Sequence, residues 1–222
     1  RAVLDRSPVL FANSFPKSGT HLLTQIMHGF AALGPAIDSG LPAVVTYEGD
    51  TGRQRTETEI VGDLQRLLPG DIAYGHVHAL PGAIEQLSKE NVAAFFILRD
   101  PRDVVVSHAH YITEMESRHI HHLYYRQALP DFDARLSASI AGISGSDLAA
   151  AGLVGAQPSA RLENEMALPD ILARFQPYVG WLAVPQVLLL RFEDLVNQRQ
   201  IMLEKVLEHA VSHGFQMNTT PE

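Results

Sequence analysis

Short apolar runs, each followed by a segment of helical composition, constrain the fold of this chain more than any other feature. Three runs stand at 8–15 (PVLFANSF), 92–99 (VAAFFILR) and 187–193 (VLLLRFE), and a weaker one at 71–77 (DIAYGHV) precedes a proline-initiated helical stretch. Continuous apolar runs of this length are typical of strands buried on both faces. Strands that alternate with helices pair in parallel through crossover connections. We therefore predict an α/β fold with an open, mostly parallel sheet flanked by helices on both faces.

The chain length of 222 residues predicts one domain across 1–222. Two Pro/Gly-punctuated or Gly/Ser/Ala-rich stretches, at about 34–60 and 117–160, are predicted as irregular excursions, with a short helix at about 57–68. We expect these excursions to form the pocket for any second substrate. The helix that follows the first apolar run is predicted from an apolar stripe that should pack on the sheet: Leu22, Leu23, Ile26, Met27 and Phe30.

Charge, cysteine content and hydropathy narrow the possible partners. The formal net charge is −8 and no Lys/Arg-rich run is present, which argues against nucleic acid as a partner. The absence of cysteine excludes disulfides and thiolate metal sites and fits a reducing compartment. The longest apolar stretches fall well below the roughly 20 residues that span a bilayer. We expect a cytoplasmic protein without a membrane span, and the sequence leaves its oligomeric state open.

The first apolar run leads into a helix through FPKSGTHLL, residues 15–23. A strand-to-helix turn presents backbone N–H groups and the positive end of the helix dipole, which suits phosphate or sulfate. Gly19 allows close backbone approach, Ser18 and Thr20 add hydroxyl donors, and Lys17 adds a positive charge. The turn is not a Walker A loop, because Pro16 stands where that motif needs glycine. An ordinary exposed turn is the alternative interpretation.

A second strand-to-helix turn follows in FFILRDPRDVVVSHAHY, residues 95–111. Asp100 is suited to cap a helix whose first position is Pro101. Arg99 at the strand end and Ser107 two turns into the helix are spaced to converge on one phosphate, with the guanidinium making bidentate contacts. Alternatively, Arg99 pairs with Asp100 or Asp103 and the serine is a solvated helix residue.

Taken together, PKSGTHLL and RDPRDVVVSHAHY resemble the two signature segments of the sulfotransferase family, which uses 3′-phosphoadenosine 5′-phosphosulfate (PAPS) as donor. A later segment at 174–195, RFQPYVGWLAVPQVLLLRFEDL, resembles the R-[FY]-E-D-L region of bacterial members. The resemblance implies a P-loop-like nucleotide-binding fold. It also implies two groups of cofactor-binding residues. The residues at the 5′-phosphosulfate are Lys17, Ser18, Gly19, Thr20 and the His21 amide. The residues at the 3′-phosphate are Arg99 and Ser107.

Two features of animal cytosolic sulfotransferases have no counterpart in this sequence. Leu22 stands where those enzymes have a tryptophan that stacks on adenine, and no R-K-G-x-x-G-type loop is present. We expect these two differences to affect the affinity for the donor rather than its identity.

Sulfuryl transfer to a hydroxyl needs a base for the acceptor proton and positive charge at the departing phosphate. His76 and His78 lie at the end of a predicted strand, at the sheet edge where α/β proteins bind ligands. A neutral imidazole accepts a proton near pH 7. Bacterial sulfotransferases have Gly-His here with a proline five residues later, a pattern that His76 and Pro81 match. The resemblance implies His76 as base, with His78 as a second candidate, and Lys17 at the leaving phosphate.

Other titratable residues have simpler interpretations. A histidine cluster shows no carboxylate spacing typical of a metal site, so we predict no metal: His108, His110, His119, His121 and His122. We expect these histidines to line the acceptor side or to lie on a solvated surface. Glu193 and Asp194 follow a strand directly and are predicted to cap the next segment and to pair with Arg191 or a neighbouring arginine, rather than to act in catalysis.

The sequence thus predicts a PAPS-dependent sulfotransferase that acts on a hydroxyl or amine of a small-molecule acceptor. One alternative is a P-loop-type nucleotide kinase, for which Asp100 would be the magnesium ligand. The other is a nucleotide-binding module without turnover.

Overall fold

The computed structural model describes residues 4–153 and 167–218 of the chain. Residues 154–160, the end of the second predicted excursion, lie outside the described residues. The chain divides into two compact units, the first made of Arg1–Thr46, Thr56–Arg99 and Pro177–Glu222, and the second of Tyr47–Arg55 and Asp100–Gln176. The assignment of 1–222 to one domain stays a prediction.

The first unit contains a sheet in which every pair of strands is parallel. The strand order is β2-β4-β1-β5-β6, and β3 pairs with β4. The strands are β1 (Val9–Ser14), β2 (Ile37–Asp38), β3 (Val44–Val45), β4 (Asp71–His76), β5 (Val92–Leu98) and β6 (Val187–Arg191). The four predicted strands and the open parallel α/β sheet are confirmed. The sequence did not predict β2 and β3, which are too short to show an apolar pattern.

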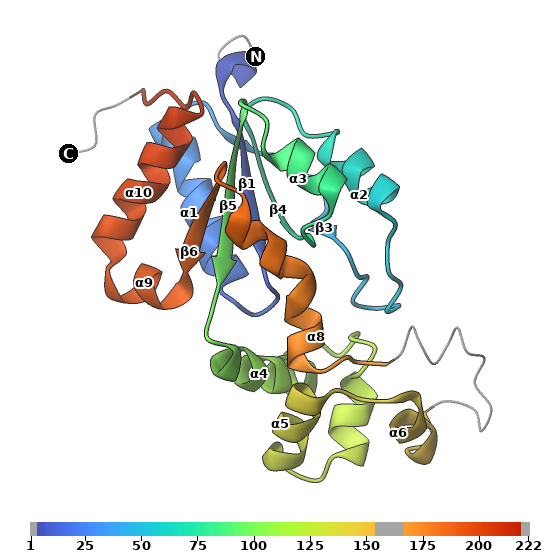
Figure 1. Cartoon of the computed structure of the whole chain (residues 1–222). Helices are drawn as coiled ribbons and strands as arrows, with labels where there is room; N and C mark the ends of the chain where they lie inside the picture. Colours follow the sequence, from blue (N-terminus) through green and yellow to red (C-terminus); the bar gives the residue numbers. More distant parts are fainter. Residues whose placement is uncertain (1–3, 154–166, 219–222) are drawn as a thin grey trace. The chain divides into compact units, whose positions relative to one another are not determined.

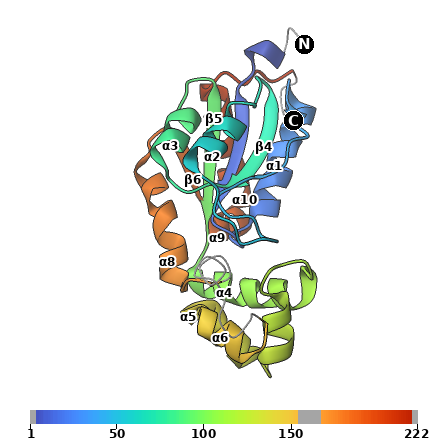
Figure 2. The ribbon, with the colours of Figure 1, turned by 90° about the vertical axis from the view of Figure 1, so that its right-hand side faces the viewer.

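Helices cover both faces of this sheet, as predicted (Figures 1 and 2). One face carries α1 (Thr20–Leu33), α9 (Phe192–Asn197) and α10 (Arg199–Ser212). The other face carries α2 (Glu57–Leu64) and α3 (Pro81–Leu87), which are joined where the Gly82 amide donates to the Glu57 carboxylate at 2.5 Å. The helix predicted at 57–68 is therefore present and ends four residues early. Two 3₁₀ segments complete this description, η1 (Leu4–Arg6) and η4 (Gln176–Ala183).

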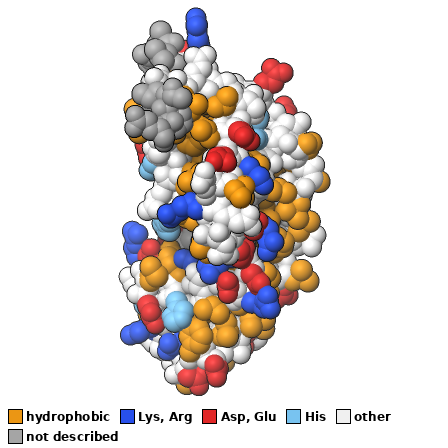
Figure 3. Space-filling model, turned by 90° about the vertical axis from the view of Figure 1, so that its left-hand side faces the viewer, with side chains coloured by type: hydrophobic (Ala, Val, Ile, Leu, Met, Phe, Trp, Pro, Cys, Tyr) orange, Lys and Arg blue, Asp and Glu red, His pale blue; other side chains and the backbone are white. Residues whose placement is uncertain are grey.

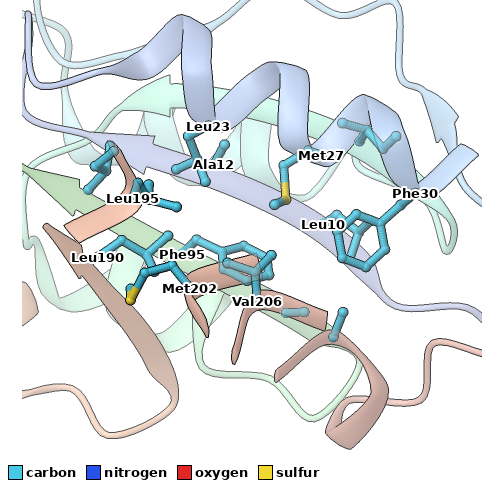
Figure 4. Close-up of a cluster of buried hydrophobic side chains, with 14 of the residues drawn as sticks. Leu10, Ala12, Leu23, Met27, Phe30, Phe95, Leu190, Leu195, Met202 and Val206 are labelled. Carbon is cyan, nitrogen blue, oxygen red and sulfur yellow. The ribbon is translucent and has the colours of Figure 1, made fainter. Parts of the chain in front are cut away.

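The core beneath α1 shows why the predicted stripe forms a helix (Figure 4). Leu23, Met27 and Phe30 are each at most 3% exposed. They pack in one cluster with Leu10 of β1 and Phe95 of β5. Burial of a large apolar side chain contributes about 1.5–3 kcal/mol, so this cluster fixes the start of α1 against the sheet.

The second unit is helical. It contains α4 (Pro101–His110), two π-helical segments η2 (Tyr111–Met115) and η3 (Tyr124–Ala128), α5 (Phe132–Ala141), α6 (Gly145–Ala150) and α8 (Ile171–Phe175). The stretch predicted to be irregular from 117 is thus more regular than expected. Side-chain caps start its helices, with Asp131 accepting from the Ala134 amide and Ser144 forming a capping box with Asp147. Small residues hid the helical period in the sequence.

Charged side chains of both signs are interspersed with hydrophobic ones on the face shown in Figure 3. Such mixing is typical of a surface without a broad positive field. Among residues 4–153 and 167–218, no helix has the length and apolar character that crossing a membrane requires.

Two histidines, the buried His78 and the half-buried His209, predict acid-sensitive stability of the first unit. Burial lowers the pKa of His78 and of His209 to about 4 from the ordinary 6.5. Between these pH values the unfolded chain binds protons that the folded chain does not, so the free energy of unfolding falls as pH falls from 6.5 to 4. Allowing for their partial solvation, we expect a loss of about 1 kcal/mol per histidine.

Thermal unfolding followed from pH 7 to pH 4 tests this expectation. His78→Phe keeps an aromatic ring beside Tyr178 and removes the titration, so its melting temperature should fall less steeply than that of the unaltered chain. Parallel pH profiles for the two proteins would contradict the assignment.

Candidate functional site

The turn between β1 and α1 has an unusual backbone. Gly19 is the N-cap of α1 with φ of +105° and ψ of 28°. Lys17 has φ of +69° and is the one non-glycine residue with positive φ in the described part of the chain. Non-glycine residues in this region cost of order 1–3 kcal/mol and cluster at ligand-binding sites. The strain at Lys17 is therefore a structural reason to regard this turn as functional.

Phe192, the first residue of α9, lies between the turn and Arg99. A Cβ atom on Gly19 would stand 2.5 Å from Cδ2 of the Phe192 ring. The Arg99 guanidinium carbon lies 4.4 Å from the centroid of the same ring, in a cation–π contact. The structure thus brings Gly19 and Arg99 to one side chain, as expected from the carboxyl ends of the neighbouring parallel strands β1 and β5. Phe192 itself was not singled out from the sequence.

The start of α1 is suited to an anion. Its first N–H groups have no intrahelical acceptor, Gly19 provides no side-chain cap, and the first turn contains no acidic residue. Ser18 is fully buried, and its hydroxyl has no hydrogen-bond partner within the described residues. Burial lowers the pKa of Lys17, and a bound anion would oppose this shift because it favours the charged ammonium. These features fit a phosphate or sulfate group, with Lys17, Ser18, Thr20 and the His21 amide around it.

His76 is the last residue of β4 and lies beside the end of β1. Its Nδ1 atom is 3.0 Å from the Ser14 carbonyl oxygen and 3.0 Å from Ser14 Oγ. A carbonyl oxygen only accepts, so Nδ1 carries the proton and Nε2 is left as the basic nitrogen. Burial lowers the pKa of His76, the Ser14 carbonyl opposes this, and the charges of Lys17 and His21 lower it further. A neutral ring near pH 7 is what a proton acceptor requires.

The backbone after His76 is held from several sides. The Asn13 side chain makes two buried hydrogen bonds to Val77, donating to its oxygen at 3.0 Å and accepting from its amide at 2.9 Å. Trp181 Nε1 donates to the same oxygen at 2.8 Å, and the His78 amide donates to Thr46 Oγ1 at 3.1 Å. These contacts satisfy the buried backbone directly after His76 and hold it beside the end of β1.

Comparisons with known proteins address the fold. No protein-family model and no curated protein matches the chain. Mouse sulfotransferase SULT7A1 complexed with PAP (adenosine 3′,5′-bisphosphate) is a solved structure with 18% identity and a TM-score of 0.49, covering 94% of this chain and 61% of that one. Retinol dehydratase with androsterone and the inactive cofactor PAP has 14% identity and a TM-score of 0.49, with coverages of 90% and 59%. Retinol dehydratase with retinol and PAP has 15% identity and a TM-score of 0.50, with coverages of 92% and 60%.

The chain shares its fold with the retinol-bound structure of retinol dehydratase, whose TM-score is 0.50. At these identities the likeness is one of fold alone, and the chain spans about 60% of the length of the matched structures. The resemblance of the two signature segments to sulfotransferases agrees with this fold, and the roles of individual residues stay predictions.

Within this fold, His78 and His76 have different surroundings. The strand ends at His76, and His78 is 6% exposed with its ring 4.7 Å from that of Tyr178. Burial lowers the pKa of His78 to about 4. His78 therefore has the character of a packed core residue, whereas His76 is oriented by the end of β1.

The second predicted turn belongs to the second unit from Asp100 onward. Asp100 caps α4 by accepting from the Arg102 amide at 2.9 Å, and Pro101 opens the helix, as predicted. The Asp100 carboxylate also binds the Arg102 side chain at 2.5 Å. Ser107 lies in α4 and is partly exposed. Its contact with the 3′-phosphate stays a prediction.

The five histidines of the predicted cluster have different surroundings. The rings of His108 and His119 have centroids 6.4 Å apart, and those of His119 and His121 are 5.3 Å apart. His108 and His121 are buried, so a solvated surface is excluded for these two. His108 lies in a buried network, where Arg174 donates to Nε2 at 3.2 Å and Nδ1 is 3.1 Å from Ser139 Oγ. His121 is 4% exposed, whereas His110 is half-exposed and lies 3.6 Å from Glu114. In the described ranges, no group of three or more His, Cys, Asp or Glu side chains is arranged to hold a metal ion.

Glu193 and Asp194 lie in the first turn of α9 rather than at its cap, which corrects the predicted position. Arg191 is the N-cap, and its Nε lies 3.9 Å from Glu193 Oε2. Acidic side chains in a first helical turn are stabilised by the helix dipole. The structure therefore agrees with the structural interpretation of this pair and with its expected contact to Arg191.

Proposed function

We propose that this protein is a PAPS-dependent sulfotransferase that acts on a hydroxyl or amine of a small-molecule acceptor. The observation that carries the proposal is that Gly19 and Arg99 both lie against the Phe192 ring, at the carboxyl edge of the sheet where α/β proteins bind ligands. The fold supports the proposal, since a structure that shares it was solved with PAP.

Each residue has a distinct role in the proposed reaction. PAPS, when bound, supplies the sulfuryl group, which forms a bond to the acceptor oxygen as its bond to the 5′-phosphate breaks. His76 Nε2 takes the acceptor proton, and Lys17 opposes the negative charge that develops on the departing phosphate. The amides at the start of α1 hold the sulfate end, and Arg99 and Ser107 hold the 3′-phosphate.

The acceptor is proposed to bind in the second unit, at a pocket lined by residues from both predicted excursions. Gly49 and Asp50 line this pocket with Tyr111 of η2 and with three residues that follow η2: Glu116, Arg118 and His119. The Ile120 amide donates to the Gly49 oxygen at 3.3 Å and holds the two segments together. The mixture of an aromatic ring and charged groups suits a small polar acceptor with an aromatic part. Cytoplasmic localisation and the absence of a nucleic-acid partner stay predictions.

The kinase alternative has less support. Asp100, its one candidate magnesium ligand, already caps α4 and binds Arg102. A Walker A glycine is also missing, because Pro16 precedes the lysine.

Thermal unfolding with added nucleotide separates the enzyme classes. A ligand that binds the folded state raises the melting temperature, by an amount equivalent to about 2.7 kcal/mol at 100 times its dissociation constant. We expect PAP to stabilise the protein and ATP with magnesium to leave it unchanged. Arg99→Met should remove most of the PAP response, because it eliminates bidentate contact with phosphate. Stabilisation by ATP with magnesium alone would contradict the donor assignment.

A further inference from the structure

Ser14 connects the proposed base to the anion-binding turn. This residue is fully buried at the end of β1. Its hydroxyl oxygen lies 3.0 Å from His76 Nδ1 and 2.8 Å from Thr20 Oγ1, the first residue of α1. The Gly75 carbonyl oxygen is a third neighbour at 3.4 Å. This serine was not singled out from the sequence.

The chemistry of these groups gives the hydrogen bonds one direction. Because the Ser14 carbonyl requires a proton on Nδ1, the imidazole also donates to Ser14 Oγ. The Ser14 proton then goes to Thr20 Oγ1, since 2.8 Å is an ordinary O–H···O distance and 3.4 Å to Gly75 is long. Thr20 in turn points its own proton away from Ser14.

An anion at the start of α1 reinforces this direction. Phosphate and sulfate oxygens accept hydrogen bonds and have no proton to give, so Thr20 donates to them. Aligned hydrogen bonds strengthen one another, and the chain from His76 through Ser14 and Thr20 ends on a negative charge. Lys17 and His21 also act on the His76 ring, and their positive charges oppose its protonation.

We propose that Ser14 is a positioning residue that relays occupancy of the donor turn to the base, holding His76 with Nε2 unprotonated and favouring its protonation once the anion is bound. This inference rests on the proposed function, because it assumes that His76 is the base. The serine touches neither the acceptor nor the sulfuryl group, so its effect passes through His76 and Thr20.

Imidazole ¹⁵N spectra of the whole protein test the relay without turnover. His76 is identified by the signal missing from His76→Gln. We expect the Nδ1–H tautomer in the free protein and a rise of the His76 pKa when PAP is added. In Ser14→Ala the tautomer should become mixed and the rise should shrink, and Ser14→Thr, which keeps the hydroxyl, should restore both.

Kinetics provide a second readout. Ser14→Ala should lower kcat about tenfold, within the range found when a group that orients a histidine is removed. The KM for PAPS should change less than threefold. Thr20→Val should abolish the same part of the PAP-induced shift in His76 pKa, and the double variant should lose no more than either single one.

Several results would overturn the relay. If His76 of the unaltered protein is the Nε2–H tautomer, the relay is excluded without any variant. The proposal can therefore be contradicted even if the Ser14→Ala protein fails to fold. An unchanged PAP-induced shift in Ser14→Ala also removes it. If PAP fails to bind at all, the proposed function fails, while the tautomer of the free protein still decides whether Ser14 orients His76.

Discussion

Replacing His76 with glutamine should lower sulfuryl transfer by about 10²–10⁴-fold, the usual contribution of a general base. The glutamine amide is able to donate to the Ser14 carbonyl, as Nδ1 does at 3.0 Å, but it cannot take up a proton near neutral pH. PAP binding should stay within about threefold, because the anion-binding groups are on other residues. Transfer is measured as PAP release from PAPS with a set of phenols, alcohols and amines as acceptors.

His78→Phe is the matched control for His76→Gln. His78 is buried against Tyr178, and burial lowers its pKa to about 4, so it has no proposed part in the chemistry. We expect this variant to retain transfer and PAP binding. Full activity in His76→Gln together with loss of activity in His78→Phe would show that His78, and not His76, is the base.

The acid limb of the activity profile should follow the same histidine. Burial and the charges of Lys17 and His21 lower the pKa of His76. The acid-side decrease in kcat/KM for PAPS should therefore have its midpoint below pH 6.5. Bound PAPS adds negative charge beside the ring, so the limb in kcat should lie at higher pH than the limb in kcat/KM.

The sequence predicted the fold well where the apolar signal was strong. The runs in β1 and β5 are buried almost throughout, so an uninterrupted apolar pattern identified them. The strands β2 and β3 have two residues each. Each pairs with β4 through backbone contacts that leave no pattern in the sequence. The helices α5 and α6 were missed because alanine and serine are compatible with both helices and loops.

Part of the candidate site was identified from the sequence because it depends on the same apolar runs. Lys17 and Arg99 follow apolar runs directly, so the parallel topology alone brings them to one edge of the sheet. The role of Ser14 depends on the register that sets the end of β1 beside the end of β4, and Phe192 depends on the path from β6 into α9. The sequence does contain a signal for Ser14, since Asn13 and Ser14 are polar residues within an otherwise apolar run.

Gly19→Ala should destabilise the protein and weaken PAP binding at least tenfold. The alanine Cβ would stand 2.5 Å from Cδ2 of Phe192, and a φ of +105° is unfavourable for any residue with a Cβ atom. Displacing the ring also displaces Arg99, whose guanidinium lies over it at 4.4 Å. Local backbone strain of this kind costs about 1–3 kcal/mol, which corresponds to a fall in melting temperature of about 3–10 °C.

Two further variants separate strain from loss of the anion site. Gly29→Ala lies in the same helix with open space around it, so it should keep PAP affinity and gain up to about 1 kcal/mol of stability. Adding Phe192→Leu to Gly19→Ala relieves the clash and removes the ring beneath Arg99. We expect the double variant to recover part of the lost stability and none of the affinity, measured by calorimetry with PAP. Recovered affinity would show that the ring does not support Arg99, and unchanged affinity in Gly19→Ala alone would remove this turn from the donor site.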